Sequence, residues 1–397
     1  MSGGGRGRRV LPLVIATAAT QSSIVVLVPI VVAVGRDLGA SVSAVGQART
    51  VLAGSAVLAT IAIARVIDRA GVRRVIVWGG SLAAAGALAS GVSPSIPFFL
   101  AAQALTGLGV ACLLSAGFAG VASYFSEGEA AWAMGYVVAA QSLAWIIGNP
   151  LIGVISEAAS WRLAYLVPGA FAAAAVAAAL VLAPPGGGAD PDRRGGLAAV
   201  LGNRSARAWT VAELVAYAAW TAELTYAGAF YIETYGVGEA TTGVLLAVGS
   251  LAFLVSTLNT RRLEGRVDRR VSIVIAALAM GGLLAVMMNV TPSVWFTLGV
   301  FCLLALSAGV RSTASSSLGL TQMPGRAGSM MAARTAAAQL GYMLGAAAGG
   351  AVLALSDFGV LGFVLFAGLG AAALLVMRVE DSRTPASSGA LPAAVPD

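Results

Sequence analysis

The stretch Asp68-Arg69-Ala70-Gly71-Val72-Arg73-Arg74 is a short charged segment between two long apolar runs, 41–64 and 75–93. A related stretch, Gly265-Arg266-Val267-Asp268-Arg269-Arg270, stands at the corresponding place in the second half of the chain, again between two apolar runs. A basic segment with one carboxylate that recurs between matching apolar runs indicates a duplicated helical bundle in a membrane.

The composition of the whole chain supports this interpretation. Of 397 residues, 58% are apolar and only 10% are charged, whereas a soluble domain carries about 25% charged residues. A spanning helix needs about 20 apolar residues, and the apolar runs are too long for the strands of a membrane barrel. We therefore predict an all-α, polytopic membrane protein with twelve transmembrane helices. They are expected near 10–34, 41–64, 75–93, 96–122, 131–155, 163–183, 209–233, 240–260, 271–290, 293–315, 328–355 and 358–378.

One long polar segment, 184–208, divides these runs into six and six. It contains prolines, glycines and charged residues, which is typical of a linker. We predict a six-helix bundle over 1–183, a cytoplasmic linker over 184–208, a second, pseudo-symmetric six-helix bundle over 209–378, and a disordered cytoplasmic tail over 379–397.

The arginines predict the orientation in the membrane. Nineteen of the 24 basic residues fall on the side of the N terminus, and only Arg36 and Arg162 fall on the other side. Cytoplasmic loops carry such an excess of arginine, so we expect both termini in the cytoplasm and a location in a bacterial cell (inner) membrane. The same distribution explains the net charge of +7 without a nucleic-acid partner. Histidine is absent, so any proton carrier must be a carboxyl group.

Several short motifs occur in order along the chain and in register with the predicted helices. Besides the segment 68–74, they are Asp37-Leu38-Gly39, Gln103-Ala104-Leu105-Thr106-Gly107-Leu108-Gly109, Gly148-Asn149-Pro150-Leu151-Ile152-Gly153 and Trp161-Arg162-Leu163-Ala164-Tyr165. With them the chain resembles the major facilitator superfamily along nearly its whole length. Gln103 stands where the family usually has arginine, and Asn149 where it has glycine. The resemblance implies two bundles around a central cavity and alternating access, and 148–153 resembles the motif of the family's antiporters.

The resemblance also implies a gate. In the family, the loop that matches 68–74 holds the two bundles together on the cytoplasmic side when the transporter faces outward. Asp68, just before the third predicted helix, would be the central residue, and Arg334 is a plausible partner from the other bundle. The alternative is that these charges only set the topology. The candidate gating residues are Asp68, Arg69, Gly71, Arg73, Arg74, Asp268 and Arg334.

Five ionisable residues fall well inside predicted spans: Arg49, Glu213, Glu223, Arg311 and Arg334. A charge at a helix centre costs about 2.5–3.5 kcal/mol on insertion scales, so a charge that is present there usually has a partner or a function. Glu223 is close to the middle of its span, and Arg49 lies roughly 12 Å deep at the rise of an α-helix. The other three lie near the cytoplasmic face, where snorkelling or helix-end electrostatics explains them.

Glu223 is the sharper functional candidate. Helical spacing places it on one stripe with Trp220 and Phe230, with Tyr226 beside it. A carboxyl group among aromatic side chains suits proton coupling or the binding of an apolar or cationic solute. A structural salt bridge to Arg49 is the alternative, and the two are compatible because protonation would break such a bridge. We predict Glu223 and Arg49 as the proton-coupling residues.

The function indicated is secondary active transport, not enzymatic catalysis, because no nucleophile–base set and no glycine-rich phosphate loop stand out. The favoured hypothesis is proton-coupled efflux of an amphipathic drug or metabolite; the alternative is a proton-coupled symporter that imports a small organic acid or other anion, with Arg49 as the anion's partner. We expect a monomer in the lipid bilayer that binds a small-molecule substrate. The proton gradient is the expected driving force, and no cofactor or metal is expected. The predicted substrate cavity comprises Gln21, Gln141, Trp145, Asn149, Trp220, Glu223, Tyr226, Phe230 and Gln339.

Overall fold

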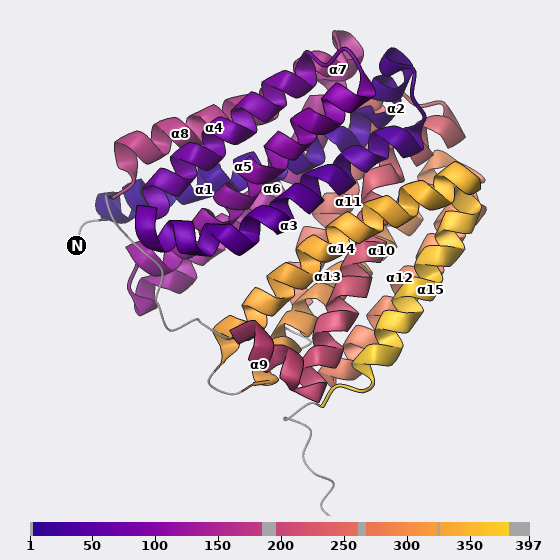
Figure 1. Cartoon of the computed structure of the whole chain (residues 1–397). Coiled ribbons are helices and arrows are strands. Elements are labelled where there is room, and N and C mark those ends of the chain that lie inside the picture. The colour runs from indigo at the N-terminus through magenta and orange to yellow at the C-terminus, as the bar shows by residue number, and fades with distance from the viewer. Residues whose placement is uncertain (1–2, 185–195, 261–266, 324–325, 381–397) are drawn as a thin grey trace, which may run out of the picture.

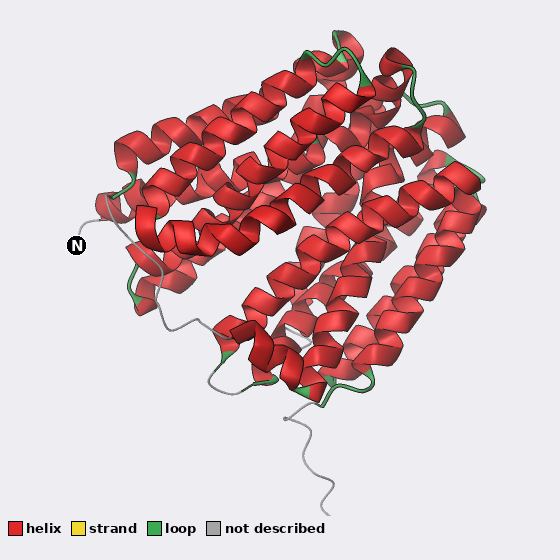
Figure 2. Cartoon of the chain, in the orientation of Figure 1, coloured by secondary structure: helices red, strands yellow, loops and turns green. Residues whose placement is uncertain are grey.

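The computed structural model describes residues 3–184, 196–260, 267–323 and 326–380. Within these ranges the chain is helical and has no strand (Figure 2). Most of the predicted tail, the first half of the predicted linker and the Gly265-Arg266 part of the repeated motif lie outside the described residues. So does the side chain of Asp68.

The helices gather in two groups, coloured indigo to magenta and red to yellow in Figure 1. We call α1–α8 the N-terminal bundle and α10–α15 the C-terminal bundle. The first comprises α1 (Gly3–Val25), α2 (Leu27–Leu38), α3 (Val42–Ala70), α4 (Val72–Gly91), α5 (Ile96–Tyr124), α6 (Glu127–Ala158), α7 (Trp161–Ala164) and α8 (Leu166–Leu182). The short α9 (Gly196–Gly202) precedes α10 (Arg204–Tyr235), α11 (Glu239–Thr260), α12 (Arg269–Asn289), α13 (Val294–Thr321), α14 (Ala327–Leu355) and α15 (Phe358–Val376).

Each predicted span corresponds to one helix or to one broken pair. The first run is broken into α1 and α2, which are bent by 43°. Pro29, three residues after the break at Val26, explains the bend because it has no N–H for the helical ladder and its ring clashes with the carbonyl four residues earlier. Pro168 stands three residues after the corresponding break at Tyr165, between α7 and α8.

Ten helical segments of the described chain are long and apolar enough to cross a membrane, and the bent α1–α2 pair makes an eleventh. The remaining predicted span is α10, which has 32 residues and carries Glu213 and Glu223 on its buried side. The pattern confirms a polytopic, all-α membrane protein. It also marks α10 as the helix with unusual polar content.

The two bundles are in contact mainly at one end. In Figure 1 they meet near α2 and diverge toward the N terminus and α9. We call the end near α2, where the bundles meet, the distal end. The end near the N terminus and α9, where the bundles diverge, is the proximal end. Two glycines of the C-terminal bundle allow the close approach at the distal end: a Cβ atom on Gly228 would overlap the carbonyl of Val28 in α2, and one on Gly243 would overlap the carbonyl of Asn149 in α6.

Candidate functional site

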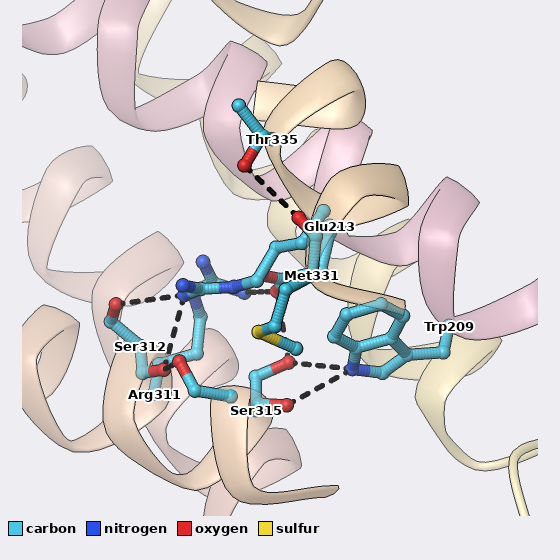
Figure 3. Close-up of polar contacts among 9 residues, drawn as sticks. Trp209, Glu213, Arg311, Ser312, Ser315, Met331 and Thr335 are labelled. Carbon is cyan, nitrogen blue, oxygen red and sulfur yellow. Dashed lines mark hydrogen bonds and ion pairs between the residues drawn. The ribbon is translucent and has the colours of Figure 1, made fainter. Parts of the chain in front are cut away.

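A buried carboxylate organises the proximal half of the C-terminal bundle (Figure 3). Glu213 on α10 is 1% exposed. Its Oε1 accepts hydrogen bonds from Arg311 Nη1 at 2.7 Å and Ser315 Oγ at 2.9 Å, and its Oε2 accepts one from Arg334 Nε at 2.8 Å. The prediction of snorkelling or helix-end electrostatics is wrong for Glu213, because the carboxylate is buried and shared by two guanidinium groups.

Further hydrogen bonds fix the partners of Glu213. Trp209 Nε1 donates to the carbonyl and the hydroxyl of Ser315, at 3.2 and 3.0 Å. Arg334 Nη2 donates to the carbonyl and the hydroxyl of Ser312, at 3.2 and 3.1 Å. Helices α10, α13 and α14 are thereby joined by a cluster of one carboxylate and two guanidinium groups, which has a net charge of +1.

Aromatic rings extend from this cluster toward the other bundle. The guanidinium carbons of Arg311 and Arg334 each lie 5.6 Å from the ring centroid of Tyr217. The rings of Tyr217 and Tyr342 make a T-shaped contact at 5.6 Å. The guanidinium carbon of Arg49, on α3 of the N-terminal bundle, lies 5.9 Å from the Tyr342 ring centroid. A continuous series of cation–π and ring contacts thus links the two bundles.

Arg49 is held at the break between α1 and α2. It is 6% exposed, and its Nη1 donates a hydrogen bond of 2.7 Å to the carbonyl of Ile24, next to the break at Val26. No carboxylate of the described residues makes an ion pair with it. The salt bridge between Arg49 and Glu223 that the sequence left open is therefore absent from this conformation.

Glu223 on α10 is fully buried, at 0% exposure. Neither of its carboxyl oxygens has a hydrogen-bond partner in the part of the chain that the structure describes. The buried hydroxyls of Tyr231 and Thr221 on the same helix also have none among those residues. Burying a carboxyl group without partners is expensive, and an ionisable residue inside the membrane is a candidate for a functional role.

Two of the predicted cavity residues of the N-terminal bundle are in direct contact. Trp145 Nε1 on α6 donates to Gln21 Oε1 on α1 at 2.9 Å. Asn149 Nδ2 donates to the Trp145 carbonyl at 2.9 Å, while its buried Oδ1 has no hydrogen-bond partner among the described residues. Gln21 and Trp145 are thus joined through their side chains, and Asn149 is joined to Trp145 through its backbone carbonyl. Gln141 is half-buried.

The aromatic residues predicted around Glu223 have separate contacts. Trp220 stacks on Phe253 at 6.1 Å, and the Tyr226 hydroxyl donates to the carbonyl of Ala346 at 3.1 Å. Phe230 packs edge-on against the ring of Phe358 at 5.3 Å. The three residues lie on α10 with Glu223, as predicted, but they do not form one continuous aromatic surface. Each side chain contacts a different neighbouring helix. Gln339 on α14 is 8% exposed.

The first basic motif ties the proximal ends of its own bundle. Asp68 lies in the last turn of α3 and not in a loop before α4, since α3 runs to Ala70 and Gly71 makes the turn with φ of +79°. Arg73 Nη2 donates to the carbonyl of Leu180 in the last turn of α8 at 2.6 Å. Arg69 and Arg74 are exposed.

The second motif also connects helix ends within its own bundle, through Asp268 and Arg270. Asp268 caps α12, because its Oδ1 accepts hydrogen bonds from the backbone N–H groups of Arg270 and Val271 at 2.8 and 3.3 Å. Arg270 Nη1 donates to the carbonyl of Val379, after the end of α15, at 3.2 Å. In this conformation Arg334, the expected partner of Asp68, is paired with Glu213 within its own bundle.

Two motifs that the sequence showed separately meet at the distal end of the N-terminal bundle. Arg162 Nη2 lies 2.7 Å from Asp37 Oδ2, and Trp161 Nε1 donates to the same oxygen at 3.1 Å. Gln103 has a structural position as well, since its Nε2 donates to Ser90 Oγ at 3.0 Å and to the Tyr165 hydroxyl at 3.1 Å.

The structure thus has two helical bundles with buried charged residues in each, and the cation–π contact between Arg49 and Tyr342 links them. A family model described as Major Facilitator Superfamily matches residues 13–333 and 210–395, and the chain belongs to this family. It is therefore a multi-pass membrane transporter and not an enzyme.

Solved structures support the same fold. A variant of the nucleoside transporter NupG is similar with a TM-score of 0.77 and 12% identity, over 93% of this chain and 99% of that chain. A D-xylose-proton symporter is similar with a TM-score of 0.77 and 12% identity, over 95% of this chain and 98% of that chain. At this identity the likeness shows the fold alone. No curated protein sequence matches.

Proposed function

We propose that this transporter exports small amphipathic organic molecules from the cytoplasm in exchange for protons, with Glu223 as the group that carries the proton. The observation that carries the proposal is the complete burial of Glu223 with both carboxyl oxygens unpaired among the described residues. The excess of arginines at the proximal end supports a cytoplasmic position for both termini.

Glu223 is suited to proton transport for two reasons. The chain has no histidine, so carboxyl groups are the remaining carriers. Glu213 is held by two guanidinium groups, whereas neither carboxyl oxygen of Glu223 has a hydrogen-bond partner among the described residues. A carboxyl group that is neutral when buried and ionised when solvated takes up a proton in one conformation and releases it in the other.

The location of Glu223 also couples it to movement of the bundles. Gly228 lies five residues further along α10 and makes the close approach to Val28 of α2 in the other bundle. Separation of the bundles at the distal end would change the surroundings of this part of α10. In alternating access, that separation opens the outward-facing state and exposes the carrier to the other side of the membrane.

An amphipathic substrate is supported by side chains that combine apolar rings with polar groups in both bundles. Trp145 with Gln21, and Tyr217 with Tyr342, are two such groups. Export is supported by the resemblance of Gly148–Gly153 to the family's antiporter motif. The alternative, proton-coupled import of an organic anion, is favoured by one observation: Arg49 is a buried cation without a carboxylate partner among the described residues.

The test begins with cells that produce the protein and a panel of fluorescent amphipathic compounds. For a compound against which the protein protects growth, collapse of the proton gradient by an uncoupler should raise the cellular content. A fall in content under the uncoupler would establish import instead.

The substitution Glu223→Gln should abolish the gradient-dependent part of the transport. Glu233→Gln is the matched control, since Glu233 lies on the same helix but is exposed at its distal end. The control should transport like the wild type, with both variants inserted in the membrane at equal levels. Full gradient-dependent transport by Glu223→Gln would overturn the role of Glu223.

A further inference from the structure

We propose that Arg49, Tyr217 and Tyr342 form a binding site for an amphipathic organic anion, with the anion's carboxylate on Arg49 and its apolar ring against the two tyrosines. The inference rests on one part of the proposed function, the transport of small amphipathic organic molecules, and deepens it because it specifies the charge of the substrate. It does not depend on the direction of transport or on which residue carries the proton.

Arg49 has the unused hydrogen-bonding capacity that such a site requires. Only its Nη1 donates a hydrogen bond to a described residue, the carbonyl of Ile24. Nη2 and Nε donate to no described residue. Neither nitrogen is among the fully buried polar atoms that lack a hydrogen-bond partner, so both retain some exposure. A guanidinium group presents its donors in a fork that matches a carboxylate. One side of the Arg49 fork is therefore fixed by the protein, and the other side remains for a ligand.

The burial of the Arg49 charge also favours the binding of an anion. The side chain is 6% exposed and has no ion pair with a described carboxylate. A buried charge without a counter-charge is unfavourable in a membrane protein and marks a functional site. Glu223 does not supply the counter-charge in this conformation, because it makes no ion pair or hydrogen bond with a described residue. A bound carboxylate would supply it.

The two tyrosines provide the apolar part of the site. Tyr342 lies next to Arg49, with the guanidinium carbon 5.9 Å from its ring centroid, and Tyr217 makes a T-shaped contact with Tyr342 at 5.6 Å. Both tyrosines are only partly buried. A ring of the ligand can extend this T-shaped arrangement, which is a favoured geometry for aromatic side chains.

Electrostatics in the neighbouring cluster selects against cations. The guanidinium groups of Arg311 and Arg334 both lie 5.6 Å from the Tyr217 centroid and share the single carboxylate of Glu213. Together with Arg49, the region around the two rings therefore has an excess of positive charge. This excess attracts a carboxylate and repels an ammonium group, although isolated tyrosine rings would favour the ammonium group.

The site is complete only when both bundles contribute. Arg49 comes from α3 of the N-terminal bundle, whereas Tyr217 and Tyr342 come from α10 and α14 of the C-terminal bundle. Movement of one bundle against the other would separate the carboxylate's donor from the rings. Ligand affinity would then depend on the conformation, which is the requirement for a transported substrate.

The experiment is isothermal titration of the full-length protein in detergent with three probes of nearly equal shape: 2-naphthoate, 2-naphthamide and 2-naphthylmethylammonium. We expect the anion to bind about tenfold more tightly than the amide, because a hydrogen bond between a guanidinium group and a carboxylate is stronger than one between a guanidinium group and a neutral amide. The ammonium compound should bind more weakly than the amide. Equal affinities, or preference for the ammonium compound, would overturn the proposal.

Variants locate the site. Arg49→Gln should lose about tenfold in affinity for 2-naphthoate and leave the affinity for 2-naphthamide nearly unchanged. Arg36→Gln, at an exposed arginine of the distal end, is the control and should bind like the wild type. If Arg49→Gln does not fold, Tyr342→Leu should weaken all three probes, whereas Tyr342→Phe should retain them. Unchanged binding in both Arg49→Gln and Tyr342→Leu would contradict the site.

Failure of this inference can be distinguished from failure of the proposed function. Titration in detergent has no proton gradient and no direction, so Glu223→Gln protein should still bind 2-naphthoate. Tight binding of 2-naphthoate together with a fall in cellular content under an uncoupler would retain the anion site and reject export. Gradient-dependent export of cations together with weak naphthoate binding would retain export and reject the anion site.

Discussion

Arg334 Nε lies 2.8 Å from Glu213 Oε2, and both residues belong to the C-terminal bundle. The arginine that the sequence suggested as a bridge to Asp68 of the other bundle is thus bound within its own bundle when the bundles meet at the distal end. A latch between the proximal ends would require Arg334 to exchange partners or Asp68 to pair elsewhere. The Glu213 cluster is accordingly a candidate element of the conformational cycle.

Glu213→Gln should destabilise the C-terminal bundle. It leaves the buried Arg311 and the half-buried Arg334 close together without their shared carboxylate, and removal of one member of a buried ion pair costs about 3–5 kcal/mol. Thermal unfolding in detergent should show a lower midpoint than for the wild type or Glu233→Gln. The double variant Glu213→Gln/Arg311→Gln should recover part of the loss, since one guanidinium group is removed. A midpoint equal to that of the wild type would contradict the importance of the cluster.

Gly243→Val should separate the bundles at the distal end. Even a Cβ atom at this position overlaps the carbonyl of Asn149, which belongs to backbone and cannot move like a flexible side chain. Spin labels on Ala158→Cys and Thr241→Cys, in a background without Cys112 and Cys302, should report a longer distance by pulsed electron paramagnetic resonance.

The control for this measurement is Gly282→Val on α12, where nothing lies within 4 Å of an added Cβ. The control should keep the distance of the unsubstituted protein. If Gly243→Val also keeps it, the close approach of α6 and α11 does not set the separation of the bundles.

Glu157 should act as a latch at the distal end. Its Oε2 on α6 accepts a hydrogen bond of 2.8 Å from the backbone N–H of Ala240, in the first turn of α11. A carboxylate at this position interacts favourably with the positive end of a helix. Glu157→Ala should increase the population of long distances between the same two spin labels, and Glu157→Gln, which retains an acceptor oxygen, should do so less. An identical distance distribution in Glu157→Ala would exclude the latch.

Asp68→Asn should slow turnover more than it weakens substrate binding, if the motif at 68–74 acts as a gate. A gate changes the rate of interconversion between conformations, whereas binding depends on side chains near mid-membrane. Transport rate in proteoliposomes and binding in detergent provide the two readouts. A wild-type rate would leave the motif with a role in topology alone.

The lengths of the apolar runs predicted most of the fold because membrane helices are long and apolar, and all backbone polar groups must be satisfied within each helix. The twelve runs correspond to α1–α2, α3–α6, α7–α8 and α10–α15. The breaks at Val26 and Tyr165 were missed, although Pro29 and Pro168 were visible signals for them.

The candidate site was less predictable because its key contacts join distant segments. Glu213, Arg311 and Arg334 stand at similar depth in three different spans, and that coincidence was the available signal for their cluster. The burial of Glu223 followed from its place at the middle of a span. The contact of Arg49 with Ile24 did not follow, because it depends on a helix break and on packing of α3 against it.

The central claim is that Glu223 carries the coupled proton, and the most direct test separates exchange from coupled transport. Proteoliposomes containing Glu223→Gln should still exchange labelled for unlabelled substrate at equilibrium, because exchange needs only substrate binding and movement of the bundles. They should fail to accumulate substrate when a pH gradient is imposed. Accumulation driven by the pH gradient at the wild-type rate would contradict the account.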